Sequence, residues 1–283
     1  MSNDTSSFIH QFKTTIMARL KGNIPFTGSL GNLSAYTRKG SNAIILRTKG
    51  GASKEKIKKA PEFANTRKVN TEFGGASAAA RHIKLAMTGL THLDHTLFQS
   101  RLTSICSAIL KMDTENANGQ RLVLISRYGR LLEGFNLEMG TIFDSIVKHP
   151  LLSSITRETL SASIDVPALF PGISLYLPGK FSLFRLIAVL GIVPDLTYHQ
   201  TFGRYQPINP SVQLKRAVHI SQWFNVSEIC VEQNIKIKIE GDTGISATDS
   251  LLLSVGIEFG IPVTTDFVQP VNYAGAAKIL VLS

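Results

Sequence analysis

The spacing of hydrophobic and polar positions changes about halfway along this chain. Between about residues 54 and 111 the apolar residues recur every three or four positions, which is typical of amphipathic helices. From about residue 155 short apolar or alternating runs are separated by Pro and Gly, which is the pattern of strands and turns. We therefore predict an α+β protein with a mainly helical N-terminal half that carries a β-hairpin, and a C-terminal antiparallel β-sandwich.

The helical half contains clear start signals. Ser53 is a suitable N-cap, and Pro61 suits the first position of a helix in which Gly74-Gly75 is a weak point or break. The N-terminal residues approximate helical spacing and indicate a short amphipathic helix or docking arm. For residues 121–148 the pattern is compatible with either a helix or a strand. The expected helices cover residues 1–22, 54–59, 61–89 and 93–111.

Two sets of strands are expected. Residues 30–37 and 43–48 form the predicted hairpin, with the turn at 38–42. In the C-terminal half, residues 235–240 alternate strictly between apolar and polar side chains. The C-terminal strands are expected at 160–166, 181–193, 212–220, 234–240, 251–259 and 276–282. Because His149-Pro150 marks a boundary, we predict a basic hairpin plus helical domain at 1–150 and a β-sandwich domain at 151–283.

Composition places the chain among folded proteins. Of its 283 residues 43% are hydrophobic and 18% are charged, which permits a large core and is compatible with surface that becomes buried in an assembly. Its two cysteines, Cys106 and Cys230, are too few for a disulfide scaffold and are expected to be reduced, partly buried thiols.

The N-terminus lacks the apolar segment of a signal peptide. The longest apolar stretch, residues 186–193, is too short to span a bilayer. We therefore expect cytoplasmic synthesis without a signal peptide and no membrane span, and the final location stays open.

The positive charge lies almost entirely in the first third of the chain. Residues 1–90 hold 15 Lys and Arg against 4 Asp and Glu, whereas the remaining residues hold 15 against 16. The residues of the candidate interaction site fall within one short basic segment: Arg38, Lys39, Arg47, Lys49, Lys54, Lys56, Lys58, Lys59, Arg67 and Lys68.

This basic segment has three interpretations. Its density suits phosphate neutralisation by a nucleic-acid-binding protein. Only Tyr36 and Phe63 supply interleaved aromatic rings, so base stacking has little support. The segment is equally compatible with a solvated face, or with docking onto an acidic patch of a neighbouring subunit.

Two short motifs are candidates for a catalytic or metal-binding site. Asp242-Thr243-Gly244 matches the aspartic-protease tripeptide, but the preceding Glu240-Gly241 favours a tight turn. His92 and His95 have a spacing that can bind a metal, yet no third ligand is specified, which favours a structural reading. Phosphate-binding and nucleophile motifs are absent. We therefore predict no catalytic residues, no metal and no cofactor.

The N-terminal region resembles a family of uncharacterised proteins common in Bacteroidota. The resemblance rests on the Phe-Thr-Gly hairpin, the Gly-Gly before the basic helix and the pattern Pro-Glu-Phe…Thr-Arg…Asn…Glu-Phe-Gly. It covers residues 22–90 clearly and implies that a recurring structural unit includes Pro61, Phe63, Thr66, Arg67, Asn70, Glu72, Phe73 and Gly74. It implies no activity and no catalytic residues.

Three functional hypotheses follow. The first is a non-enzymatic structural protein that self-assembles into a homo-oligomer such as a filament, tube or shell. The second is a nucleic-acid-binding or packaging protein that uses the basic segment 38–68. The third is a hydrolase that uses Asp242.

Overall fold

The computed structural model of the protein describes residues 17–19, 26–38, 43–93, 98–264, 267–272 and 274–283. The chain divides into two compact units, Met1–Phe63 and Ala64–Ser283. The boundary predicted from the sequence lies at residue 150. The helices predicted over 61–89 and 93–111 belong mainly to the second unit, together with the later strands.

The first unit contains a four-stranded antiparallel sheet with the order β1-β4-β3-β2. Its strands are β1 (Met17–Arg19), β2 (Gly28–Leu30), β3 (Leu33–Thr37) and β4 (Ile44–Thr48). The pairing of β3 with β4 confirms the predicted hairpin. The first predicted strand, 30–37, is too long, because Leu30 belongs to β2 and pairs with Leu33 across a turn at Gly31-Asn32. The helix predicted over 1–22 is wrong at β1, because Ala18 pairs with Leu46 and thereby fills the free edge of β4. The other residues of that prediction lie largely outside the described ones.

After the sheet come a short helix and a single 3-10 turn. Helix α1 (Lys54–Lys59) has the predicted N-cap, since the Ser53 hydroxyl accepts a hydrogen bond from the Lys56 amide at 3.2 Å. The 3-10 helix η1 (Pro61–Phe63) begins at the predicted proline. Neither helix contains a buried residue, so both lie on the surface of the first unit.

Two long antiparallel strands form the centre of the second unit. Strand β7 (Leu183–Pro194) pairs with β13 (Asp249–Pro262) over twelve residue pairs. Both strands are buried almost throughout, because each of their faces is covered by another layer. This explains why the sequence reads there as continuous apolar runs rather than as an alternation.

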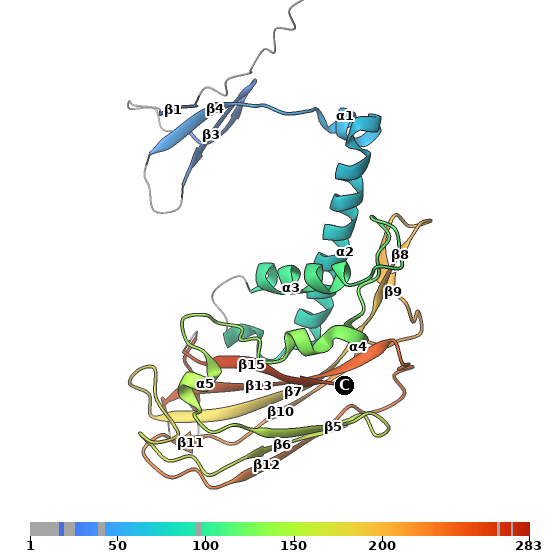
Figure 1. The fold of residues 1–283 in the computed structure, drawn as a ribbon. Coiled ribbons are helices and arrows are strands. Elements are labelled where there is room, and N and C mark those ends of the chain that lie inside the picture. The colour runs from blue at the N-terminus through green and yellow to red at the C-terminus, as the bar shows by residue number, and fades with distance from the viewer. Residues whose placement is uncertain (1–16, 20–25, 39–42, 94–97, 265–266, 273) are drawn as a thin grey trace, which may run out of the picture. The chain divides into compact units, whose positions relative to one another are not determined.

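Helices cover one face of this long sheet. Helices α2 (Ala64–Ala86) and α3 (Gln99–Lys111) pack against each other and above the sheet, as Figure 1 shows. Ile187 and Val189 of β7 point into this layer and share a core with Ile83 and Leu102. The sheet is completed by β10 (Arg216–Ile220), β11 (Phe224–Asn225), β14 (Val268–Pro270) and β15 (Ala276–Leu282).

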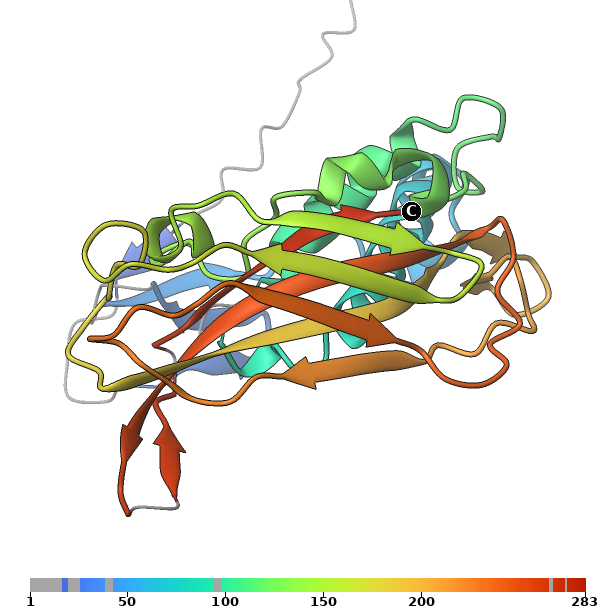
Figure 2. The same cartoon turned by 90° about the horizontal axis from the view of Figure 1, so that it is seen from below.

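A smaller sheet covers the opposite face. Its strands β5 (Leu152–Thr156), β6 (Ser161–Val166) and β12 (Gln233–Lys238) have the order β12-β6-β5. Figure 2, which views the molecule from below, shows these strands in front of the long ones. Leu186 and Leu190 of β7 point into a second core that includes Ile164 and Ile235. Successive side chains of β7 therefore point alternately into two different cores.

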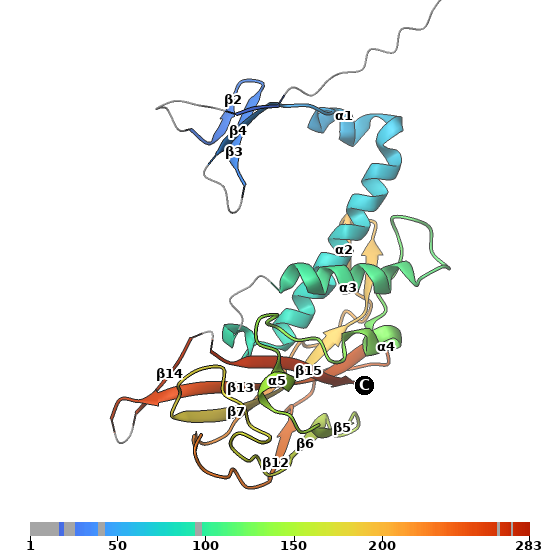
Figure 3. The same cartoon turned by 60° about the vertical axis from the view of Figure 1, so that its left-hand side comes forward.

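The remaining elements are short and lie around these layers. Residues 121–148, which the sequence left open, form α4 (Ile125–Tyr128), the 3-10 helix η3 (Gly129–Leu132) and α5 (Phe143–Ile146). The other elements are the 3-10 helix η2 (Thr91–Leu93) and a hairpin of β8 (Leu196–His199) and β9 (Arg204–Pro207). Figure 3 shows β14 reaching beyond the end of the long sheet.

The predicted fold class is confirmed at its coarser level, since the protein mixes helices with several antiparallel sheets. The helical N-terminal half fits only in part, because strands occupy much of residues 17–48. Helix α2 continues through Gly74 and Gly75, so the alternative of a break at these residues is wrong. A Cβ at Gly75 would stand 2.6 Å from the Tyr205 ring, so the glycine makes room for that ring.

Candidate functional site

The structure distributes the ten predicted basic residues over both units. Arg38, Arg47 and Lys49 lie in or next to the sheet of the first unit, and four lysines lie on α1. Arg67 and Lys68 belong to α2 in the second unit. Lys39 lies outside the described residues. The first unit as a whole holds 11 Lys and Arg against 3 Asp and Glu.

Some of these cations have partners inside the first unit. Arg47 lies over the Tyr36 ring at 5.5 Å, and the Lys49 ammonium donates to the carbonyl oxygen of Gly31 at 3.0 Å. Lys56 pairs with Glu62 at 3.3 Å. Lys54 and Lys58 are exposed, and neither forms an ion pair within the described part of the chain. They lie four residues apart on α1 and therefore face the same side.

The sheet of the first unit has one apolar face. The register places on this face alternate residues of β2, β3 and β4, namely Leu30, Leu33, Ala35, Ile44 and Leu46. Only Ala35 is buried among residues 26–38 and 43–63, and Leu30 keeps 66% of its surface exposed. A single buried alanine does not make a core, so this face gains stability only if another apolar surface covers it.

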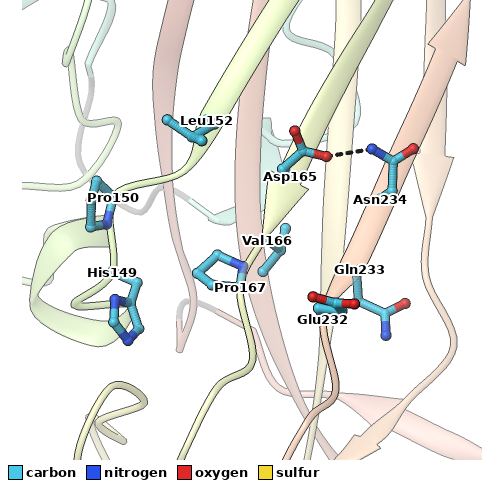
Figure 4. A pocket seen from close by; sticks show the side chains of 9 residues that line it. All are labelled: His149, Pro150, Leu152, Asp165, Val166, Pro167, Glu232, Gln233 and Asn234. Atoms are coloured by element: carbon cyan, nitrogen blue, oxygen red, sulfur yellow. Dashed lines mark hydrogen bonds between the residues drawn. The ribbon is translucent and has the colours of Figure 1, made fainter.

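The second unit carries a surface groove at one end of its three-stranded sheet. The groove has a volume of about 740 Å³ and is formed by the segments 149–152, 165–167 and 232–234 (Figure 4). Pro150, Leu152 and Pro167 supply apolar surface, and Leu152 is 70% exposed. The groove is therefore lined by apolar side chains that are in contact with water.

Two carboxylates lie among these apolar residues. Asp165 accepts a hydrogen bond from the Asn234 side-chain amide, and Figure 4 shows the two side chains pointing toward each other. Their residues face each other across β6 and β12. Glu232 is exposed two residues before Asn234, and no hydrogen bond or ion pair of its side chain is found within the described residues. The groove thus combines apolar surface with negative charge.

The exposed face of β12 continues from this groove, and the charge of its side chains changes from negative to positive along the strand. Glu232 and Asn234 are followed on the same face by Lys236 and Lys238, all of them exposed. Opposite the lysines lie hydroxyl groups, of which Ser154 and Ser163 are hydrogen-bonded at 2.9 Å. Glu240 follows on this face and pairs with Lys238 at 3.7 Å. A partner that docks along the face therefore meets negative charge at Glu232 and positive charge at Lys236.

The residues of the aspartic-protease tripeptide lie in an irregular segment after β12, where the Asp242 side chain closes an Asx turn. The Asp242 carboxylate accepts a hydrogen bond from the Gly244 amide at 3.0 Å. Gly241 and Gly244 have φ angles of +77° and +58°, which favour glycine, as in the tight turn that the sequence favoured. The Lys215 ammonium donates to the Asp242 carbonyl oxygen at 2.7 Å.

The histidine pair can be followed at one residue only, because His95 lies outside the described residues. The Nε2 atom of His92 lies 2.7 Å from the Glu258 carboxylate, and Arg185 donates to the same carboxylate at 2.5 Å. Burial alone would raise the pKa of Glu258, but the hydrogen bonds from His92 and Arg185 outweigh it and the pKa lies below its usual value. Among the described residues, no group of three or more His, Cys, Asp or Glu could hold a metal.

Sequence reasoning missed the groove and the Glu258 cluster. The groove joins three segments that only the pairing of β5, β6 and β12 brings together. Glu258 and Arg185 are opposite each other in the register of β7 and β13, and each interrupts an apolar run. A charge inside such a run is the only sequence signal that could have pointed to this pair.

No protein-family model, no curated protein and no solved structure matches this chain. Within the described residues, no helix is both long and apolar enough to cross a membrane. Functional interpretation therefore rests on the surfaces themselves.

Proposed function

We propose that this chain is a non-enzymatic structural protein that assembles with copies of itself into an extended structure such as a filament, tube or shell. In this proposal the second unit is the scaffold, with its two stacked sheets acting as a β-sandwich, and the first unit is the connecting arm. The observation that carries the proposal is the apolar face of the first unit, on which Ala35 is the one buried side chain among the described residues.

Burial of apolar area stabilises a sheet by about 25 cal/mol per Å². Leu30, Leu33, Ile44 and Leu46 remain exposed or half-buried, so most of this gain is still available to an interface. A contact between an arm and a different surface of the next copy is a head-to-tail contact. Where the rotation between successive copies does not close a ring, such contacts generate open, repeating assemblies.

Assembly of the purified chain of 283 residues tests the proposal directly. We expect light scattering and negative-stain electron microscopy to show large particles whose amount increases with protein concentration. The variant Leu30→Asp places a charge on the apolar face and should prevent assembly. Ser29→Asp is the matched control, because Ser29 lies next to Leu30 but points to the opposite face of the sheet. A chain that stays monomeric at all concentrations and salt conditions would contradict the proposal.

A second candidate function is nucleic-acid binding or packaging, and the exposed lysines of α1 favour it. Lys54, Lys56, Lys58 and Lys59 are all exposed within one short helix. This function predicts binding that weakens steeply with salt and is lost in the variant Lys54→Glu/Lys58→Glu. Unchanged electrophoretic mobility of DNA and RNA at low salt would reject it.

A further inference from the structure

The groove of the second unit and the surface of the first unit are complementary in both charge and polarity. The groove presents Asp165 and Glu232 beside Pro150, Leu152 and Pro167. The first unit carries an excess of eight positive charges, as well as the apolar face that includes Leu30 and Leu33. Apolar surface rimmed by charge marks interaction sites, and opposite charges across an interface favour the correct partner.

We propose that this groove is the docking site for the N-terminal unit of a second copy of the chain. The lysines of α1 then face Asp165 and Glu232, and apolar side chains of the arm contact Leu152 and the two prolines. The inference rests on the proposed self-assembly and adds to it the surface on the scaffold that receives the arm.

Other occupants fit the groove less well. The carboxylates of Asp165 and Glu232 repel the phosphates of a nucleic acid. Sites for small molecules bury most of their ligand. In this groove Asp165, Glu232 and Leu152 are all exposed, so it suits a larger partner that covers it from outside.

The charge order along β12 also defines a direction for docking. A basic segment is attracted to Glu232 and repelled at Lys236, which lies further along the same face. The charge of Lys238 is offset by its ion pair with Glu240. This arrangement selects one orientation of the arm, because the reversed orientation places like charges together. It also supplies a control position on the same strand and the same face.

Charge reversal tests the docking site. We expect Asp165→Lys/Glu232→Lys to raise the protein concentration needed for half-maximal assembly by about tenfold or more. Lys54→Glu/Lys58→Glu on α1 should have a similar effect. The matched control Lys236→Glu should leave this concentration unchanged or lower it, because it removes positive charge from the docking face. Unchanged assembly of both reversed variants would overturn the inference.

Combination of the two reversals then identifies the partner. An equimolar mixture of the groove variant and the α1 variant should assemble, since each supplies the surface that the other lacks. A chain that carries all four substitutions should assemble by itself. If the four-fold variant assembles but the mixture does not, the arm contacts its own chain and the inference is wrong.

Folding is checked separately. The unfolding midpoint of each variant should match that of the unmodified chain, because the substituted side chains are exposed. If Asp165→Lys disturbs the pairing with Asn234, Glu232→Lys alone provides the test. Failure of the unmodified chain to assemble would reject the proposed function. Assembly that is insensitive to groove and α1 charges would reject only the docking site.

Discussion

Gly191 of β7 packs directly against Ala86 of α2. A Cβ atom on Gly191 would lie 2.4 Å from the carbonyl oxygen of Ala86, which is closer than real Cβ contacts allow. The absence of a side chain at this position lets the helix layer approach the long sheet.

The same substitution at two glycines should therefore have opposite effects. Gly191→Ala forces the Ala86 backbone away from the sheet and should lower the free energy of unfolding by about 1–3 kcal/mol. Gly74→Ala should raise it by up to about 1 kcal/mol, because Gly74 lies within α2 and a Cβ there meets no atom within 4 Å. Denaturant titration measures both values. Equal effects of the two substitutions would contradict this packing.

Glu258 should make stability depend on acidic pH. A carboxyl whose pKa is lower in the folded than in the unfolded state stabilises the fold above the unfolded pKa, and this contribution is lost as the pH falls. The pKa of Glu258 is shifted in this direction by His92 and Arg185, against the effect of burial. This contribution should therefore be lost progressively as the pH falls below the ordinary pKa of a glutamate, about 4.3.

The variant Glu258→Gln tests this pH dependence. At pH 7 it should lower the free energy of unfolding by about 3 kcal/mol, since Arg185 then loses its charged partner. The difference from the unmodified chain should shrink as the pH falls toward 3. Glu133→Gln, at an exposed position, should change stability by less than about 0.5 kcal/mol. A difference that stays constant with pH would show that the charge of Glu258 is not responsible.

Both cysteines should be unreactive in the folded protein. Cys106 is fully buried and its pKa is raised to about 12, while burial also raises the pKa of Cys230. The thiolate is the reactive form, so a thiol reagent at pH 8 should label neither residue without denaturant and both after unfolding. Cys106→Ser assigns the signals. Rapid labelling of the native chain would contradict the burial of these thiols.

The sequence predicted those elements whose hydrophobic pattern is contained within one short segment of the chain. The strict alternation at 235–240 and the apolar runs of β7 and β13 correspond to strands because their residues face one or two cores. The serine-rich strand β5 escaped prediction, since its polar residues give little periodic signal. β8 and β9 lie between the expected strands 181–193 and 212–220, in a segment for which no strand was predicted.

The groove could not be predicted for a different reason. Leu152, Asp165 and Asn234 form a row only because β5 pairs with β6 and β6 with β12 in one particular register. A shift by one residue would turn each of these side chains to the other face. By contrast, the basic segment was visible from composition alone, although the structure divides it between two units.

The two units should differ in their ability to fold alone. Every residue of the two hydrophobic cores lies between Ala76 and Leu282, so a fragment of residues 64–283 retains both cores. It should unfold cooperatively, with a midpoint close to that of the full chain measured under monomeric conditions. A fragment of residues 1–63 has a sheet in which only Ala35 is buried among the described residues, and it should show little protection from amide hydrogen exchange.

Addition of the larger fragment to the smaller one then reports on the contact between copies. If the groove receives the arm, residues 64–283 should increase amide protection within β2, β3 and β4 of the small fragment, and the variant Asp165→Lys/Glu232→Lys should not. The larger fragment with Lys236→Glu serves as the positive control. Strong protection of the small fragment by itself would show that its sheet is stable without a cover, which would remove the main support for the arm.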